Sequence, residues 1–253
     1  MVNVILSGCG GKMGKVVSET VKSRSDIKIV AGVDKFSAGG LGYNVYESFV
    51  DIKESADVII DFSHPSLFSS LVSFSKDKKI PVVMCTTGLS REQIDELYKL
   101  SEDVAVFYSA NMSLGVNLII DLCKKAASAL YGSFDIEIIE KHHNQKIDAP
   151  SGTALMIADA MKSVLSKDIY YELDRASKRE KRSVNEIGIS AVRGGNIVGE
   201  HEVIFAGKDE VISISHKAYS KEIFALGAVN AAVYLAGRKS GLYNMESMLK
   251  EIL

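Results

Sequence analysis

The stretch VILSGCGGKMGK, residues 4–15, joins a short apolar run to a cluster of glycines and then to the start of a helical pattern. A strand, a glycine-rich turn and a helix in this order are typical of a dinucleotide site, because the open N–H groups at the helix N-terminus can hold a pyrophosphate. The usual fingerprint places its last glycine where Met13 stands, but here Gly14 follows instead. We therefore expect a turn one residue longer than usual after Gly8, with Lys12 and Met13 at its tip.

The residues after this stretch continue an alternation of strands and helices. Each expected strand is almost continuously apolar, which is typical of strands buried on both faces of a parallel sheet. The first part of the chain is therefore predicted to be a Rossmann-like, doubly wound α/β domain with a parallel sheet. The strands are expected over 2–8, 27–34, 56–63, 80–88 and 104–113, and the helices over 15–24, 66–79 and 90–102.

Beyond residue 113 the pattern changes to strands with few helices between them. We expect strands over 134–143, 184–195, 201–207 and 210–220, and helices over 115–131 and 152–165. Turn signals within 194–200 and 207–210 predict hairpins. The sequence thus predicts an α+β domain with an open mixed sheet over 114–220 for substrate binding and oligomerisation. A dinucleotide-binding domain is expected over 1–113, with a C-terminal helix within 221–253 packing back on it.

Composition and charge exclude several classes of protein. Apolar residues make up 47% of the chain, and 30 basic against 32 acidic side chains give a net charge of -2. The net charge is therefore too small to attract nucleic acid or an anionic membrane to the protein as a whole. No apolar run approaches the roughly 18 residues that span a bilayer. The three cysteines lack zinc-ligand spacing, so we expect no metal site and a reducing, cytoplasmic setting. The basic run at 175–182 is expected to be a solvated loop or helix face.

Asp34 ends the second expected strand, where a carboxylate can accept hydrogen bonds from the adenosine ribose. Lys35 follows directly, and a cation at this place could pair with the 2′-phosphate of NADP. The two side chains favour different cofactors. The sequence therefore leaves NADH and NADPH both open.

The segment EKHHNQKIDAPSGTAL, residues 140–155, contains the densest group of reactive side chains. Neighbouring residues of a strand point to opposite faces, so only one of His142 and His143 can point into a given cleft. Histidine suits proton transfer near neutral pH, and Lys146 can donate a proton or hold an anion. Pro150 precedes a helix that begins near Ser151, Gly152 and Thr153, whose open N–H groups suit a carboxylate or phosphate.

Taken together, these motifs resemble the 4-hydroxy-tetrahydrodipicolinate (dihydrodipicolinate) reductase family over nearly the whole chain. The resemblance rests on GCGGKMG, DFSHP, TTG, SANMSLGVN, EKHHNQKIDAPSGTA, RGGNIVGEH and HKAYSKEIFALGAVNAA, which occur in this order. It implies an oxidoreductase of the diaminopimelate route to lysine that reduces a small cyclic dicarboxylate with NADH or NADPH. It also implies a homotetramer joined through the sheets of the C-terminal domains.

The resemblance also implies roles for individual residues. His142 matches the family's proton donor or acceptor, and Lys146 matches its proton-donating and substrate-binding lysine. Further substrate contacts are expected at His143, Ser151, Gly152 and Thr153. Cofactor contacts are expected at Gly8, Cys9, Gly10, Gly11, Lys12, Met13, Asp34, Lys35, Cys85, Thr86, Thr87, Ser109, Ala110, Asn111 and Met112.

Two positions depart from the family pattern, and two other classes of function stay open. Cys85 stands where a glycine is common, and Lys221 stands where an arginine is common, which puts a bidentate contact in doubt. One alternative is another two-domain NAD(P)-dependent reductase, such as a semialdehyde or homoserine dehydrogenase. The other is a non-catalytic NAD(P)-binding redox sensor, which would leave the 140–153 cluster without a use.

Overall fold

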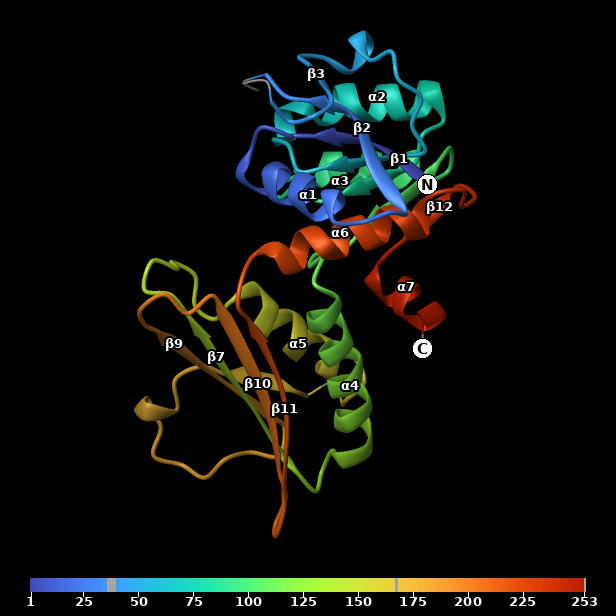
Figure 1. Cartoon of the computed structure of the whole chain (residues 1–253). Coiled ribbons are helices and arrows are strands. Elements are labelled where there is room, and N and C mark those ends of the chain that lie inside the picture. The colour runs from blue at the N-terminus through green and yellow to red at the C-terminus, as the bar shows by residue number, and fades with distance from the viewer. Residues whose placement is uncertain (36–39, 167, 253) are drawn as a thin grey trace. The chain divides into compact units, whose positions relative to one another are not determined.

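The computed structural model describes residues 1–35, 40–166 and 168–252. The chain forms two compact units (Figure 1), and the first is discontinuous in sequence. Unit 1 comprises Met1–Leu114 and Glu222–Leu253, and unit 2 comprises Gly115–Lys221.

Unit 1 is built on a seven-stranded parallel sheet with the order β12-β6-β5-β4-β1-β2-β3. The chain runs outward from β1 through β2 to β3 and then restarts at β4 on the other side of β1. The strand order therefore reverses between the neighbours β1 and β4, which is the topological switch point. α/β proteins bind ligands at the carboxyl ends of the two strands at this point. The strands are β1 Val2–Ser7, β2 Ile27–Val33, β3 Asn44–Tyr46, β4 Val58–Asp61, β5 Val82–Met84, β6 Ala105–Tyr108 and β12 Gly241–Tyr243.

Helices cover both faces of this sheet and give the unit two apolar cores. On one face lie α1 (Lys12–Lys22), α6 (Glu222–Leu235) and α7 (Met245–Ile252), whose buried side chains join those of the strands. On the other face lie α2 (Phe68–Lys78) and α3 (Arg91–Leu100), with the short 3-10 helices Phe49–Asp51 and Pro65–Leu67. The predicted doubly wound α/β architecture is confirmed. The short edge strands β3 and β12 and the helix α7 were not predicted.

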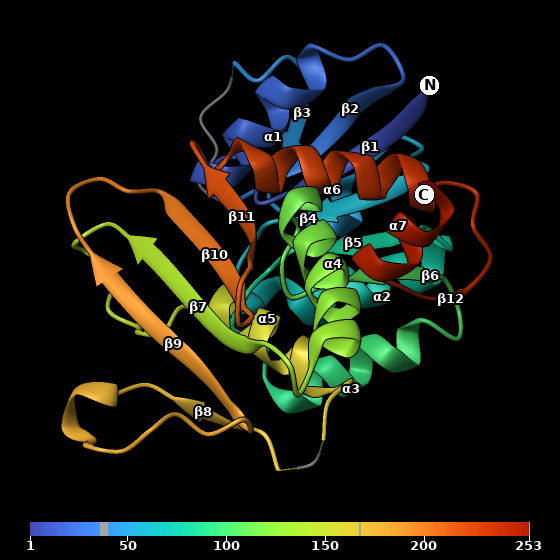
Figure 2. The same cartoon turned by 90° about the horizontal axis from the view of Figure 1, so that it is seen from below.

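Unit 2 is built on a five-stranded mixed sheet with the order β11-β10-β7-β9-β8. The helices α4 (Leu114–Leu130) and α5 (Gly152–Lys162) lie on one face of this sheet in both views (Figures 1 and 2) and share an apolar core with it. The strands are β7 Asp135–His142, β8 Tyr170–Glu172, β9 Glu186–Arg193, β10 Gly199–Ala206 and β11 Val211–Ala218. The expected open mixed sheet is confirmed.

Only one of the two expected hairpins forms. The strands β10 and β11 pair antiparallel around the turn at 207–210, as predicted. The strands β9 and β10, however, do not pair with each other, because β7 lies between them and bonds to both. The connection over 194–198 therefore crosses the end of β7. It is held there because the Gly194 N–H donates to the His142 carbonyl at 2.9 Å.

The basic run at 175–182 is largely exposed, as expected for a solvated loop or helix face, but three of its cations are also held in ion pairs. It contains a 3-10 helix, Arg175–Ser177, and its cations pair with carboxylates of unit 2. The side chain of Arg182 is only 16% exposed and pairs with Asp135 and Glu137. Cations of this run therefore pair with carboxylates of the strands β7, β8 and β9.

Candidate active site

The glycine turn after β1 is shaped by close contacts that leave no space for side chains. Gly8 has a φ of 76°, and a Cβ there would lie 2.4 Å from the Phe62 carbonyl oxygen. A Cβ at Gly14 would lie 2.1 Å from the Gly8 carbonyl oxygen. Gly14 thus lies inside the first turn of α1, where it lets the helix pack against the turn.

The placement of Lys12 and Met13 corrects the expectation of a longer turn. Gly11 is the N-cap of α1, so Lys12 and Met13 are the first two helical residues and not the tip of a loop. Their N–H groups lie in the first turn, among the donors that a helix N-terminus leaves without intrahelical partners. The late glycine is therefore explained by its packing role inside the helix.

A cavity of about 480 Å³ opens beside this turn, at the carboxyl ends of the central strands. It brings together the predicted residues Gly8, Gly11, Asp34 and Lys35. Asp34 Oδ2 accepts a hydrogen bond from the Gly10 N–H at 2.9 Å, which ties the end of β2 to the turn. The glycine turn, the carboxylate and the open helix start fit a dinucleotide. Cys9 is different, because its side chain is fully buried in the core and only its backbone can serve a ligand.

Another part of the cavity wall is formed by the segment after β4, which sequence reasoning did not assign to the site. It includes Phe62, Ser63 and His64. The ring of His64 accepts a hydrogen bond from the Ser66 N–H and caps the 3-10 helix Pro65–Leu67. The signal that could have found this wall is topological, since β4 is the neighbour of β1 at the switch point.

The segment 85–87 follows β5 and is tied to the end of β4. The Cys85 N–H donates to the Asp61 carbonyl, and Thr86 Oγ1 donates to Asp61 Oδ2 at 2.6 Å. Burial raises the pKa of the Cys85 thiol well above its usual value, so Cys85 stays a neutral thiol. Burial likewise raises the pKa of Asp61. Thr87 is exposed.

The segment 109–112 follows β6 and packs closely against α6. Ser109 Oγ donates to the Asn111 carbonyl, and Asn111 Oδ1 accepts from the Ser113 N–H at 2.8 Å. Met112 is buried, whereas Ala110 is exposed. A Cβ at Gly227 of α6 would lie only 1.6 Å from the Met112 carbonyl oxygen. Gly227 therefore lets α6 approach this segment, a role that the sequence pattern did not show.

The end of β7 in unit 2 carries the predicted histidines. Buried residues alternate along the strand and end with Glu140 and His142, whereas His143 follows the end of the strand and is half-buried. His142 Nδ1 lies 2.6 Å from Glu140 Oε2. Its ring packs edge-on against His201 of β10, with the ring centroids 5.2 Å apart. The strand ends at His142, so the expectation that the two histidines point to opposite faces stays a prediction.

Glu140 is the central acceptor of this cluster. Arg193 of β9 donates to both of its carboxylate oxygens, at 2.7 Å each. Burial alone would raise the pKa of Glu140, but the hydrogen bonds from Arg193, His142 and the Ser151 N–H hold it below its usual value. Sequence reasoning did not assign Glu140, Arg193 or His201 to the site. The alternation of strand faces places Glu140 beside His142, but the pairing with β9 and β10 needed the structure.

The helix α5 begins beside this cluster. Ser151 is its N-cap, accepts from the Ala154 N–H and lies 3.0 Å from His201 Nε2 through its Oγ. Ser151 therefore serves the protein's own hydrogen bonds. Gly152 is exposed, with open space where a Cβ would stand, and Thr153 follows it in the first helical turn. The Lys146 Nζ lies 2.8 Å from Asp148 Oδ1 and is only partly exposed.

Within residues 1–35, 40–166 and 168–252, no helix is both long and apolar enough to span a membrane. The same residues contain no group of three histidine, cysteine or carboxylate side chains that could hold a metal ion.

The parallel sheet with its glycine turn, together with a second unit carrying histidines and a lysine, is the arrangement expected of an oxidoreductase that uses a pyridine nucleotide. Two family models cover almost the whole chain: "Dihydrodipicolinate reductase, N-terminus" matches residues 2–112 and "Dihydrodipicolinate reductase, C-terminus" matches residues 115–249. The chain therefore belongs to the dihydrodipicolinate reductase family, and the resemblance seen in the sequence is confirmed. This membership sets aside the sensor and the other two-domain reductases.

Individual relatives agree with this assignment. The 4-hydroxy-tetrahydrodipicolinate reductase of Clostridium novyi (strain NT) is 51% identical over 250 residues, which covers 99% of both chains. That of Caldanaerobacter subterraneus subsp. tengcongensis is 53% identical over 251 residues, with the same coverage. A solved structure of the dipicolinate-bound dihydrodipicolinate reductase from Paenisporosarcina sp. TG-14 matches all of both chains with a TM-score of 0.80 and 25% identity.

Proposed function

We propose that this chain reduces 4-hydroxy-tetrahydrodipicolinate to tetrahydrodipicolinate with NADH or NADPH, in the diaminopimelate route to lysine in the cytoplasm. The observation that carries the proposal is the buried Glu140–His142 pair at 2.6 Å beside the open start of α5. Such a pair suits proton transfer next to a receptor for a carboxylate. Full-length relatives that carry the name of this reductase support the same substrate.

The roles that we propose in unit 1 follow from the glycine turn after β1 and the start of α1. We assign the pyrophosphate to the backbone of residues 8–13 and the ribose to Asp34 and Lys35. The segments 85–87 and 109–112 lie at the carboxyl ends of β5 and β6, and we assign them to the nicotinamide side. When bound, the nicotinamide supplies the hydride for the substrate ring. Cys85 contributes only its backbone and a neutral thiol.

The roles in the second unit follow from the facing of β7 and the start of α5. We assign proton exchange with the substrate to His142, with Lys146 as a second proton donor that also binds a carboxylate. His143, Gly152 and Thr153 are assigned to substrate contacts, because the exposed start of α5 offers N–H groups and positive partial charge. Ser151 acts there chiefly as the N-cap that fixes the helix start.

The cofactor preference is tested by following nicotinamide absorbance with enzymatically generated substrate and either cofactor. We expect both NADH and NADPH to be oxidised, with less than a hundredfold difference in kcat/KM, about 3 kcal/mol. Because a cation favours the 2′-phosphate, Lys35→Ala should weaken the use of NADPH about tenfold and leave NADH unchanged. An equal loss with both cofactors would refute this assignment, and the absence of turnover with either would refute the proposed function.

The substrate site is tested with dipicolinate, the molecule bound by the Paenisporosarcina relative. It should compete with the substrate and not with the nucleotide, because its two carboxylates match the charge of the proposed receptor. Lys146→Ala should weaken this inhibitor about 10- to 100-fold, as for a lost hydrogen bond to a charged group of about 1.5–3 kcal/mol. Thr153→Val should weaken it less, since the backbone donors remain. Unchanged inhibition of Lys146→Ala would place the anion site elsewhere.

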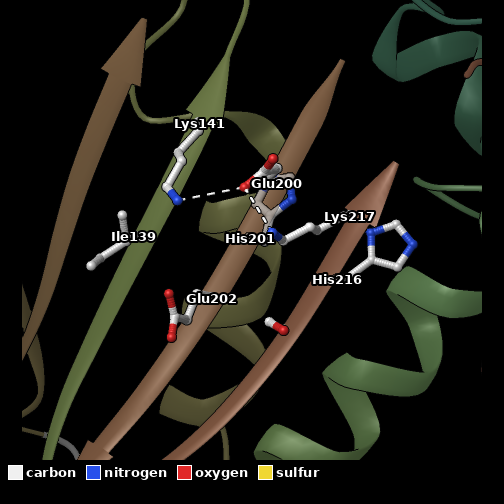
Figure 3. Close-up of a pocket in the computed structure, with 8 residues that line it drawn as sticks. Ile139, Lys141, Glu200, His201, Glu202, His216 and Lys217 are labelled. Atoms are coloured by element: carbon white, nitrogen blue, oxygen red, sulfur yellow. Dashed lines mark hydrogen bonds and ion pairs between the residues drawn. The ribbon is translucent and has the colours of Figure 1, made fainter. Parts of the chain in front are cut away.

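We also propose that the chain assembles as a homotetramer through the sheet of unit 2. Among the described residues of this unit, no helix lies against the face opposite α4 and α5 in either view (Figures 1 and 2). On that face Val192 and Val211 are 43% and 63% exposed. A cavity of about 200 Å³ lies on the same strands (Figure 3), where Glu200 pairs with Lys141 and Lys217. A second subunit can bury such a surface.

A further inference from the structure

The side chain of Glu140 is fully buried and receives hydrogen bonds from three separate parts of unit 2. His142 on the same strand and Arg193 on β9 both bond to it through their side chains. The Ser151 N–H at the start of α5 donates to Oε1 at 2.9 Å. Since a buried carboxylate is costly without partners, this set of donors explains how the charge is tolerated. Glu140 thereby links the histidine to the helix start that we assign to the substrate.

The hydrogen bond to Glu140 determines which ring nitrogen of His142 carries its proton. An ionised carboxylate can only accept, so Nδ1 must carry the hydrogen at 2.6 Å from Oε2. The neutral ring then has its lone pair on Nε2. Beside Nε2 lies Gly199, where a Cβ would come within 3.1 Å. Glycine at position 199 therefore keeps side-chain atoms away from Nε2.

Among the described charged groups near His142, Glu140 is the carboxylate that its ring contacts. Arg193 on β9 and Lys146 in the following loop are cationic, so neither can compensate a positive charge on the ring. His201 on β10 is neutral above acidic pH, because burial and the nearby His142 lower its pKa to about 4. The carboxylate of Glu140 is the partner that compensates an imidazolium at this position.

We propose that Glu140 is a positioning residue, which holds His142 as the Nδ1–H tautomer and so reserves Nε2 for proton exchange with the substrate. This inference rests on the role proposed above for His142. Glu140 acts through His142 and not on the substrate, because its own oxygens are saturated by internal donors.

The first test is the tautomer of His142, read from the ¹⁵N chemical shifts of its imidazole at pH 7.5. In the unaltered protein we expect a protonated Nδ1 and an unprotonated Nε2. In Glu140→Gln we expect a mixture of the two tautomers, because a glutamine amide can either donate or accept. The matched control is Glu137→Gln, which removes a carboxylate paired with Arg182 on the opposite face of the same strand. An Nε2–H tautomer in the unaltered protein would overturn the inference without any variant.

The second test is a double-mutant cycle on kcat. Glu140→Gln should lower kcat about 10- to 100-fold and leave the Kd for NADH unchanged. Added to His142→Gln, it should cause little further loss, because a residue that acts through another has nothing left to position. A full additional loss would mean that Glu140 acts merely on the fold.

The two proposals fail in different ways. If His142→Gln leaves kcat unchanged, the proposed role of His142 is wrong, whatever tautomer the spectra report. If His142→Gln lowers kcat by 100-fold or more but Glu140→Gln leaves both kcat and tautomer unchanged, the reductase function stands and the inference about Glu140 is overturned.

Discussion

His201 is a buried histidine at the centre of the acid/base cluster, with only 4% of its surface exposed. Its Nε2 lies 3.0 Å from Ser151 Oγ, whereas its Nδ1 has no hydrogen-bond partner within the described part of the chain. Burial, and secondarily the charge of His142, lower its pKa from 6.5 to about 4. The folded chain therefore keeps this ring neutral over a pH range in which an unfolded chain would protonate it.

This histidine should make the stability of the chain depend on pH. Because the folded pKa is depressed, the unfolded state binds more protons between pH 6.5 and 4, so stability is full above this window and falls as the pH falls through it. The free energy of unfolding should fall by about 3 kcal/mol across this window, because each unit of difference in pKa corresponds to 1.36 kcal/mol. Urea unfolding at pH 7.5, 5.5 and 4 should show a smaller loss in His201→Gln than in the unaltered protein. Parallel losses in both proteins would contradict this account.

At the scale of elements, the packing of the first turn of α1 determines whether the proposed pyrophosphate site can form. Gly14 lets this turn contact the backbone of the loop before it, since a Cβ would lie 2.1 Å from the Gly8 carbonyl oxygen. Helix and loop would have to separate to accommodate any side chain at this position. The N–H groups that we assign to the pyrophosphate belong to these same two pieces of chain.

Gly14→Ala should therefore affect both folding and cofactor binding. We expect a loss of about 1–3 kcal/mol in stability from overpacking and a Kd for NADH at least tenfold weaker. The matched control is Gly194→Ala, because a Cβ at Gly194 meets no atom within 4 Å. Thermal unfolding and fluorescence titration with NADH measure the two effects. Equal behaviour of the two variants would show that the close contact at Gly14 is not required.

The elements that the sequence predicted are those with strong apolar periodicity or a marked glycine turn. The central strands and the helices α1 to α6 belong to this group, because each depends on local pattern. The edge strands β3 and β12 are only three residues long and depend on a neighbouring strand for their definition. The path of 194–198 across β7 could not be predicted either, since Gly-rich connections serve hairpins and crossings alike.

Local sequence pattern also predicts only some of the residues that contact His142. The alternation of side chains along β7 places Glu140 on the same face as His142. By contrast, Arg193 and His201 reach this face only because β9 and β10 flank β7 in the sheet. Strand order is a long-range property, so a reading of local pattern misses these partners.

At the scale of the whole molecule, the uncovered face of the sheet in unit 2 carries the assembly proposal. Ile139 of β7 lies on this face, directly opposite Glu202 of β10. Ile139→Lys places a cation beside that carboxylate, so the single chain should still fold while an apolar contact between subunits is lost. We expect sedimentation to show a tetramer for the unaltered chain and smaller species for this variant.

The control for assembly is Val50→Lys, which changes a valine of unit 1 that is 84% exposed. It should sediment as the unaltered chain does. A fully active monomer at micromolar concentration for the unaltered chain would refute the tetramer. A tetramer that persists in Ile139→Lys would move the interface away from this face.

The discontinuity of unit 1 has a consequence for synthesis on the ribosome. The helix α6 supplies Ala228, Val229 and Leu235 to the core beneath β1 and β4, yet it follows all of unit 2 in the chain. While translation proceeds, the nucleotide-binding sheet emerges first, but one of its faces is covered only by α1 until α6 and α7 are made. The intervening unit, whose segments are contiguous, can close its own core earlier. The part of the protein that begins the chain is therefore the last to finish folding, and a nascent chain stalled before α6 exposes an apolar sheet to chaperones and proteases.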